Sequence, residues 1–123
     1  MKDLTRLYTH PDCEIHEMPR HPEHPDRLRS IMTRLSASGI MSETNVILAD
    51  EVSNDILSKV HLESYIESIN RSEPDSNVIK VEPDTYMSRG SLRASKLAAG
   101  WNLAALICSR IHDANAERSK TRC

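Results

Sequence analysis

Apolar residues along the chain recur at spacings that predict one clearly amphipathic helix near the amino terminus. Between Pro25 and Gly39 they fall at positions i, i+3, i+4 and i+7, which places them on one face of a helix. Proline suits the first position of a helix, and a glycine just past the last apolar residue suits its end. The four apolar residues of this face are Leu28, Ile31, Met32 and Leu35.

Three shorter apolar runs have the length of β-strands. They cover residues 4–8, 46–49 and 78–81. Residues 9–24 contain several prolines, each of which biases the preceding residue away from helix, so we expect a loop there. Strands that alternate with helical patterns favour an α/β architecture.

The second half of the chain is expected to be mainly helical. Ser53 can cap a short helix, and helical spacing of apolar residues resumes over residues 62–69. A longer helix is expected from Ser88 or Ser91 to about Ile111.

Composition and charge indicate a soluble globular chain without an electrostatic surface for nucleic acid or membranes. Charged residues make up 28% and hydrophobic residues 38% of the 123 positions, and the net charge is -2. No apolar signal segment follows Met1, and the longest apolar stretch is too short to cross a bilayer. Three widely spaced cysteines suit a reducing compartment. We expect a cytoplasmic protein that binds neither nucleic acid nor membrane.

Three segments carry motifs of a known family. The first is His21-Pro22-Glu23-His24-Pro25-Asp26-Arg27-Leu28, and the second is Val60-His61-Leu62-Glu63-Ser64-Tyr65-Ile66. The third is Glu82-Pro83-Asp84-Thr85-Tyr86-Met87-Ser88, followed by Ala94, Ala98, Ala99 and Gly100. In this order they resemble the zinc-dependent histone deacetylase and acetylpolyamine amidohydrolase family, in its bacterial or class II-like form. The resemblance implies the incomplete amino-terminal part of an arginase/deacetylase-type α/β domain with a parallel sheet.

The resemblance also implies a chemistry whose residues this sequence lacks. Family members hydrolyse N-acetyl amides, such as acetyl-lysine and acetylpolyamines, with a zinc ion held by two aspartates and a histidine, beside a histidine pair and a tyrosine. The sequence has no His-His dipeptide and no Asp-x-His triplet, and no tyrosine follows Tyr86. We therefore expect a truncated member that is inactive by itself, with no catalytic residue and no metal ligand; zinc belongs to the complete domain.

Two residues match family positions that have a role. Arg27 corresponds to the arginine at the floor of the cavity through which acetate leaves, although charge pattern alone favours a surface arginine in an ion pair. Glu63 falls where many members carry an aspartate that grips the substrate at the channel rim. A solvated helix glutamate is the alternative there. His61 is expected to be a structural histidine, hydrogen-bonded beneath the loop.

A group of histidines and one cysteine suggests a second, competing site. The spacing of His10, Cys13 and His16 superficially suits zinc, and His21 and His24 follow. No second pair of cysteines completes a tetrahedral set, so we expect no structural metal in this loop.

The chain is expected to divide into residues 1–111, the amino-terminal part of a deacetylase-like domain, and a divergent polar tail over residues 112–123. The segment from Leu97 to Cys108 is apolar on nearly every side, which predicts burial between other elements. We expect it to bind the missing remainder of the deacetylase domain or a second copy of the chain. The alternative is a small non-catalytic interaction module that retains the deacetylase front end.

Overall fold

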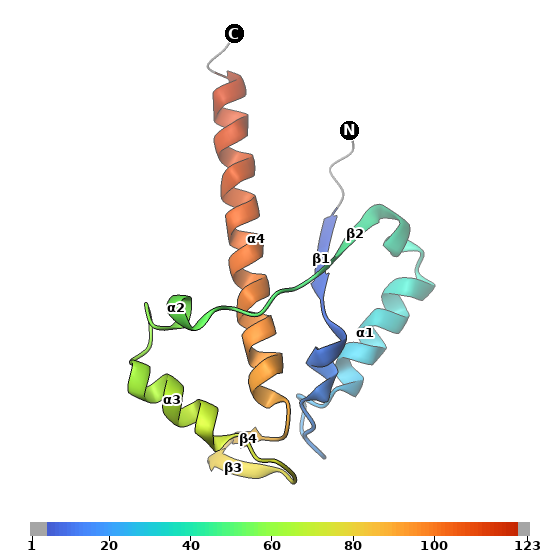
Figure 1. Ribbon diagram of the computed structural model, residues 1–123. Coiled ribbons are helices and arrows are strands. Elements are labelled where there is room, and N and C mark those ends of the chain that lie inside the picture. Colours follow the sequence, from blue (N-terminus) through green and yellow to red (C-terminus); the bar gives the residue numbers. More distant parts are fainter. Residues whose placement is uncertain (1–4, 121–123) are drawn as a thin grey trace.

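Two short parallel strands lie side by side in the amino-terminal half of the chain (Figure 1). β1 (Thr5–Thr9) pairs with β2 (Thr44–Leu48) along its whole length, and α1 (Asp26–Ala37) lies in the crossover between them. The computed structural model describes residues 5–120, with side chains as far as residue 110, so the first residue expected in β1 lies outside this range. The α/β class and the predominance of helix over short strands are confirmed.

α1 has the predicted apolar face, but little covers it. Pro25, expected as the first helical residue, is the N-cap, and the helix begins one residue later. Gly39 follows the helix with a φ of +76°, in the left-handed region that glycine adopts without strain. No residue of α1 is buried, and the Ile31 side chain is 48% exposed.

The loop expected over residues 9–24 contains a short 3-10 helix, η1 (Pro11–Ile15), and a second one, η2 (Ile40–Glu43), precedes β2. Proline occupies the first turn of η1, where its missing N–H costs no hydrogen bond. The prediction of irregular chain was therefore wrong at η1.

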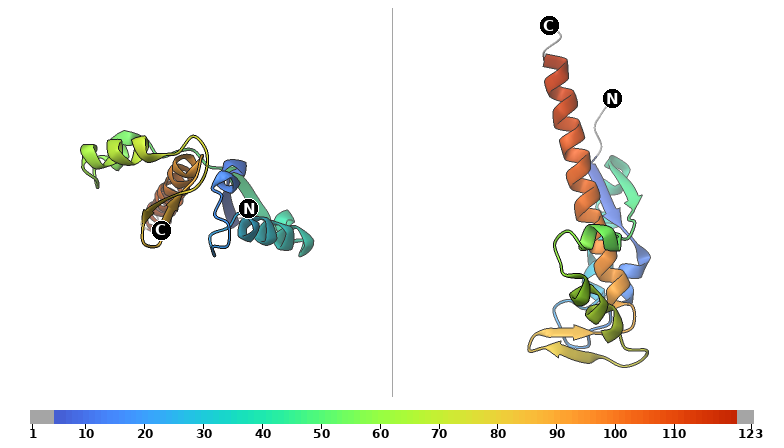
Figure 2. Two further views of the ribbon diagram at one scale, coloured as in Figure 1. Left: turned by 90° about the horizontal axis from the view of Figure 1, so that it is seen from below. Right: turned by 60° about the vertical axis from the view of Figure 1, so that its left-hand side comes forward.

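The middle of the chain forms two helices and a hairpin. α2 (Asn54–Leu57) and α3 (Glu63–Ser72) lie on the opposite side of α4 from the two parallel strands (Figures 1 and 2). β3 (Ile79–Glu82) pairs in antiparallel fashion with β4 (Thr85–Met87), a strand that the sequence did not predict.

α4 (Ser91–Lys120) is the longest element and continues beyond the expected end near Ile111. It runs antiparallel to β1, and the extended segment between β2 and α2 crosses it (Figure 1). At the crossing, the Val52 N–H donates a hydrogen bond of 3.0 Å to the carbonyl oxygen of Lys96.

Arg93, near the start of α4, forms ion pairs that connect this helix with two other segments. Its guanidinium lies 2.5 Å from the carboxylate of Asp12 in η1, and it also pairs with Glu51 in the crossing segment. These groups are partly exposed, so we regard them as fixing orientation more than supplying stability.

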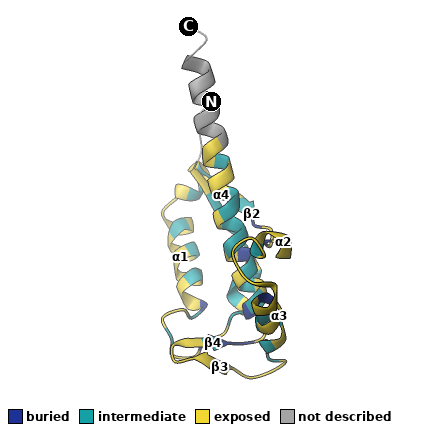
Figure 3. Cartoon of the chain, turned by 90° about the vertical axis from the view of Figure 1, so that its left-hand side faces the viewer, coloured by how far each residue is buried: buried dark blue, intermediate teal, exposed yellow. Residues whose placement is uncertain are grey.

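The core within the described residues is small. Leu97 is the most deeply buried large side chain, at 1% exposure. The chain exposes 9605 Å², whereas a compact monomer of its mass exposes about 6,700 Å². α1 and the hairpin are mostly exposed or half-buried (Figure 3), and Leu106 and Ile107 of α4 are 54% and 50% exposed. The burial expected for the segment from Leu97 to Cys108 is therefore incomplete. The buried apolar residues are Met18, Ala49, Val52, Ile66, Met87 and Leu97.

Candidate functional site

A groove of about 530 Å³ brings the three sequence motifs together. It opens between the start of α1, the β3–β4 hairpin and the first turns of α4. Arg27 comes from the first motif, Tyr65 from the second and Tyr86 from the third. Segments that are far apart in the sequence therefore form one concave surface, which is where binding residues usually gather.

The two residues assigned by resemblance lie in different surroundings. Arg27 is exposed, lines the groove and makes no ion pair with any residue in the described range. Glu63 is the first residue of α3, is exposed, and lines neither this groove nor the smaller cavity described below. The fold therefore does not bring Glu63 to Arg27, and the two roles stay predictions.

A buried network of hydroxyl groups joins η1 to the start of α4. Nδ1 of His16 lies 2.6 Å from Oγ of Ser91, which also accepts a hydrogen bond of 2.8 Å from the backbone N–H of Ser88. Oγ of Ser88 in turn accepts one of 2.9 Å from the backbone N–H of Glu17. Both serines are 4% exposed, so these contacts satisfy groups that would otherwise be buried without partners.

Burial shifts two titratable groups in this region. It lowers the pKa of His16, an effect that the nearby Glu23 carboxylate opposes and His21 reinforces. Burial, with a smaller contribution from Asp12, raises the pKa of the Cys13 thiol. Cys13 is therefore less reactive than an ordinary thiol, because the thiolate is the nucleophile.

Glu73 caps the amino terminus of α4 from the end of α3. Its Oε1 accepts hydrogen bonds of 2.9 Å and 3.0 Å from the backbone N–H groups of Gly90 and Leu92. A carboxylate is favourable there because it meets both the unpaired N–H groups and the positive end of the helix dipole.

Three histidines of the proposed competing metal site have local structural partners. In each His-Pro-acid triplet, Nδ1 accepts a hydrogen bond from the backbone N–H two residues later. The pairs are His10 with Asp12 at 3.1 Å, His21 with Glu23 at 3.2 Å and His24 with Asp26 at 3.2 Å. Among the residues whose side chains are described, no group of three His, Cys, Asp or Glu residues could hold a metal ion.

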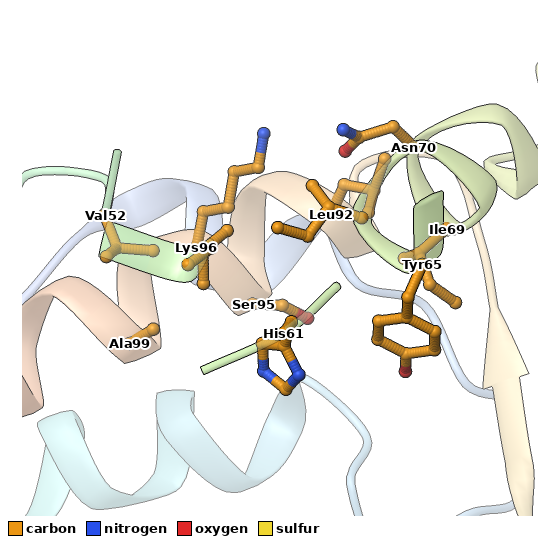
Figure 4. A pocket seen from close by; sticks show the side chains of 11 residues that line it. Val52, His61, Tyr65, Ile69, Asn70, Leu92, Ser95, Lys96 and Ala99 are labelled. Atoms are coloured by element: carbon orange, nitrogen blue, oxygen red, sulfur yellow. The ribbon is translucent and has the colours of Figure 1, made fainter. Parts of the chain in front are cut away.

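A smaller cavity of about 190 Å³ lies between α3 and α4, with largely aliphatic walls (Figure 4). His61 and Tyr65 lie at its edge, with ring centroids 5.6 Å apart. The His61 side chain is exposed and makes no hydrogen bond within the described residues, which differs from the expected histidine bonded beneath a loop; only its backbone N–H donates one, of 2.9 Å, to the carbonyl oxygen of Leu57. Its ring lines the cavity and packs against the ring of Tyr65.

Sequence reasoning missed most of the polar groups that build this region. Ser88 and Ser91 lie in the third motif, but Ser88 precedes α4, so their spacing of three residues did not by itself indicate that the two side chains meet. Nothing in the sequence around Glu73 indicates that it caps a helix beginning eighteen residues later. Trp101 lines the groove with its Nε1 atom buried and without a hydrogen-bond partner among the described residues.

Comparisons with known proteins identify the class to which this fold and groove belong. The model of the histone deacetylase domain matches residues 21–118. The chain therefore belongs to the histone deacetylase family, as its three motifs indicated.

Relatives and a solved structure place the chain within a larger domain. It is similar to Histone deacetylase 15 of Arabidopsis thaliana, with 33% identity over 98 residues, and to Histone deacetylase 8 of the same plant, with 29% identity over 89 residues. These alignments cover 77% and 72% of this chain but 17% and 24% of the relatives. The crystal structure of the HDA15 HD domain superposes with a TM-score of 0.68 at 28% identity, covering 79% of this chain and 29% of that one.

No helix within the described range is long and apolar enough to cross a membrane.

Proposed function

We propose that this chain forms the amino-terminal part of a histone deacetylase domain, and that it is inactive in the absence of the remainder. The superposition on the HDA15 HD domain carries the proposal, because the chain adopts that arrangement over 79% of its length while accounting for 29% of that structure. The histone deacetylase match over residues 21–118 supports the same role. Hydrolysis of acetylated amides is then a property of the assembled domain.

The side chains that could donate to a metal ion support a role in holding the fold and not in binding zinc. The three His-Pro histidines use Nδ1 to hold turns, and the zinc ligands implied by the family motifs have no counterpart in the sequence. We therefore assign no step involving zinc to these residues. By resemblance, Arg27 faces the product cavity of the assembled domain, and Glu63 lies near the substrate channel.

The proposal is tested with purified full-length chain loaded with zinc and assayed on an acetyl-lysine reporter peptide. No hydrolysis above that of zinc in buffer is expected. Hydrolysis is expected when the chain is mixed with the polypeptide of the HDA15 HD domain that follows the matched segment. Turnover by the chain alone that is abolished by a chelator would contradict the proposal.

Arg27→Ala, measured in the mixture with the HDA15 polypeptide, distinguishes a role of Arg27 in the product channel from a role in the fold. We expect slower turnover with unchanged association, whereas Arg34→Ala, an exposed arginine on the same helix, should leave both unchanged. Equal turnover for Arg27→Ala and Arg34→Ala would show that Arg27 has no role in the channel.

A further inference from the structure

The cavity between α3 and α4 has the size and the walls of a pocket for one apolar group. Val52 of the crossing segment and Ile66 of α3 line it, and both are buried. An apolar cavity of about 150 Å³ holds one benzene molecule. At about 190 Å³ this cavity therefore has room for a phenyl ring with one further carbon, which is the side chain of phenylalanine. The other aliphatic walls come from α2, α3 and α4 and are Leu57, Ile69, Leu92 and Ala99.

Two polar side chains lie on one side of this cavity without partners. Lys96 is the one residue with a fixed charge among the described residues that line it. Neither the Lys96 ammonium group nor the Asn70 carboxamide makes an ion pair or hydrogen bond with another described side chain. In Figure 4 both groups extend to the same side of the cavity, whereas the rings of His61 and Tyr65 lie on the other side. Because an ammonium and a carboxamide N–H both donate to a carboxylate, the occupant should combine an apolar group with a carboxylate.

Exposed apolar side chains beside the cavity indicate an occupant larger than a small molecule. Val60 and Leu62 flank His61 in the sequence, and they are 76% and 77% exposed. Apolar surface of this kind around a pocket is typical of protein-binding sites. Binding energy at such sites is concentrated in a few side chains, often aromatic, that fill a pocket. A small carboxylate would fill the cavity but leave Val60 and Leu62 uncovered.

We propose that this cavity is a docking site for an acidic segment of a partner protein, which inserts one phenylalanine side chain. The phenyl ring packs between Val52 and Ile66, and a neighbouring carboxylate of the segment binds Lys96 and Asn70. The rest of the segment covers Val60 and Leu62. Arg27 lines the groove and not this cavity, so the site is separate from the proposed product channel and goes beyond the proposed function.

Three blocked peptides test the apolar and the acidic parts of the proposal. The probe is acetyl-Asp-Glu-Phe-Glu-Asp-amide; a second peptide has alanine in place of phenylalanine, and a third has Asn and Gln in place of the acids. We expect the probe to bind the full chain and to shift the methyl NMR signals of Val52 and Ile66. The alanine peptide should bind at least about tenfold more weakly, and the neutral peptide about three- to fivefold more weakly. Equal binding of the three peptides would overturn the proposal.

Two pairs of variants locate the binding. Ala99→Leu fills the cavity and should weaken binding of the probe at least about tenfold, whereas Ala98→Leu adds the same side chain at a residue that lines only the groove. Lys96→Met should abolish the advantage of the acidic peptide over the neutral one. Lys59→Met, at an exposed lysine that lines neither cavity, should retain it.

The fold of each variant is checked by circular dichroism against the unsubstituted chain. Unchanged binding of the probe by Ala99→Leu would overturn the proposal. If Ala99→Leu loses helix, the comparison of Lys96→Met with Lys59→Met decides, and an equal preference for the acidic peptide in both variants would overturn it.

The same measurements distinguish three other occupants, each of which would overturn the proposal. Phenylacetate that binds as tightly as the probe would make a small carboxylate the occupant. A dimer of the chain that Ala99→Leu dissociates would make it a second copy. Loss of probe binding on addition of the HDA15 polypeptide would assign the cavity to the remainder of the deacetylase domain.

Discussion

The backbone carbonyl oxygen of Asp50 occupies the space that a side chain on residue 100 would need. A Cβ atom on Gly100 would lie 2.0 Å from that oxygen, which is far inside van der Waals contact. Gly100 therefore lets the segment between β2 and α2 cross directly over α4, and it explains in physical terms the glycine that ends the third motif.

Gly100→Ala should displace the crossing segment. The Val52 N–H would then lose the Lys96 carbonyl as its acceptor, and we expect its amide to exchange at least about tenfold faster, since overpacking costs about 1–3 kcal/mol or more. Hydrogen exchange measured by NMR checks this. Gly39→Ala is the control, because no atom lies within 4 Å of a Cβ at Gly39 and any strain there comes from its φ of +76°. Unchanged exchange at Val52 in Gly100→Ala would contradict the steric argument.

Removing the charge of Glu73 should loosen the start of α4. Glu73→Gln keeps the shape of the side chain but weakens the acceptor for Gly90 and Leu92. Capping interactions contribute about 0.5–2 kcal/mol, so the two amides should exchange about 2- to 30-fold faster. Glu67→Gln, which removes an exposed ion pair with Arg71, should leave them unchanged.

The chain should become less stable as the solution is acidified. Burial lowers the pKa of His16 in the folded chain, so below the ordinary imidazole value of about 6.5 the unfolded chain binds more protons than the folded one. Stability from this group is therefore present above that value and lost below it. Urea unfolding at about pH 7.5 and about pH 5.5 should show the loss, and His16→Gln should reduce it. His61→Gln, at an exposed histidine, is the control for the loss of an imidazole elsewhere in the chain.

The isolated chain should unfold without a sharp transition. Six apolar side chains are buried among the described residues, whereas Leu48, Leu106 and Ile107 are each at least half exposed. We expect a broad thermal transition and enhanced fluorescence of anilinonaphthalene sulfonate, both suppressed by the complementary polypeptide. A sharp, cooperative transition of a monomer would favour the interaction module instead.

Local patterns predicted the helices and most strands. The spacing of apolar residues located α1 to within one residue of its observed start, and the run at residues 46–49 located β2. The hairpin strand β4 was missed because three residues carry too short a pattern, and its pairing with β3 depends on a partner elsewhere in the chain.

The candidate site was less predictable because its contacts join distant positions. His16 meets Ser91, and Glu73 meets Gly90, only after α4 has been placed against η1 and α3. The pattern of α1 specified which face is apolar but not what covers it, and Ile31 remains 48% exposed. Arg27 lines the groove, and the role assigned to it by its motif comes from the family rather than from periodicity and stays a prediction.

The three His-Pro turns also fix the tautomers of their rings. Because Nδ1 accepts a backbone hydrogen bond at His10, His21 and His24, each neutral ring carries its proton on Nε2 and keeps no free lone pair. A metal ion could coordinate one of these rings through Nδ1 only by displacing a backbone amide. The three histidines of this segment thus stabilise its backbone turns.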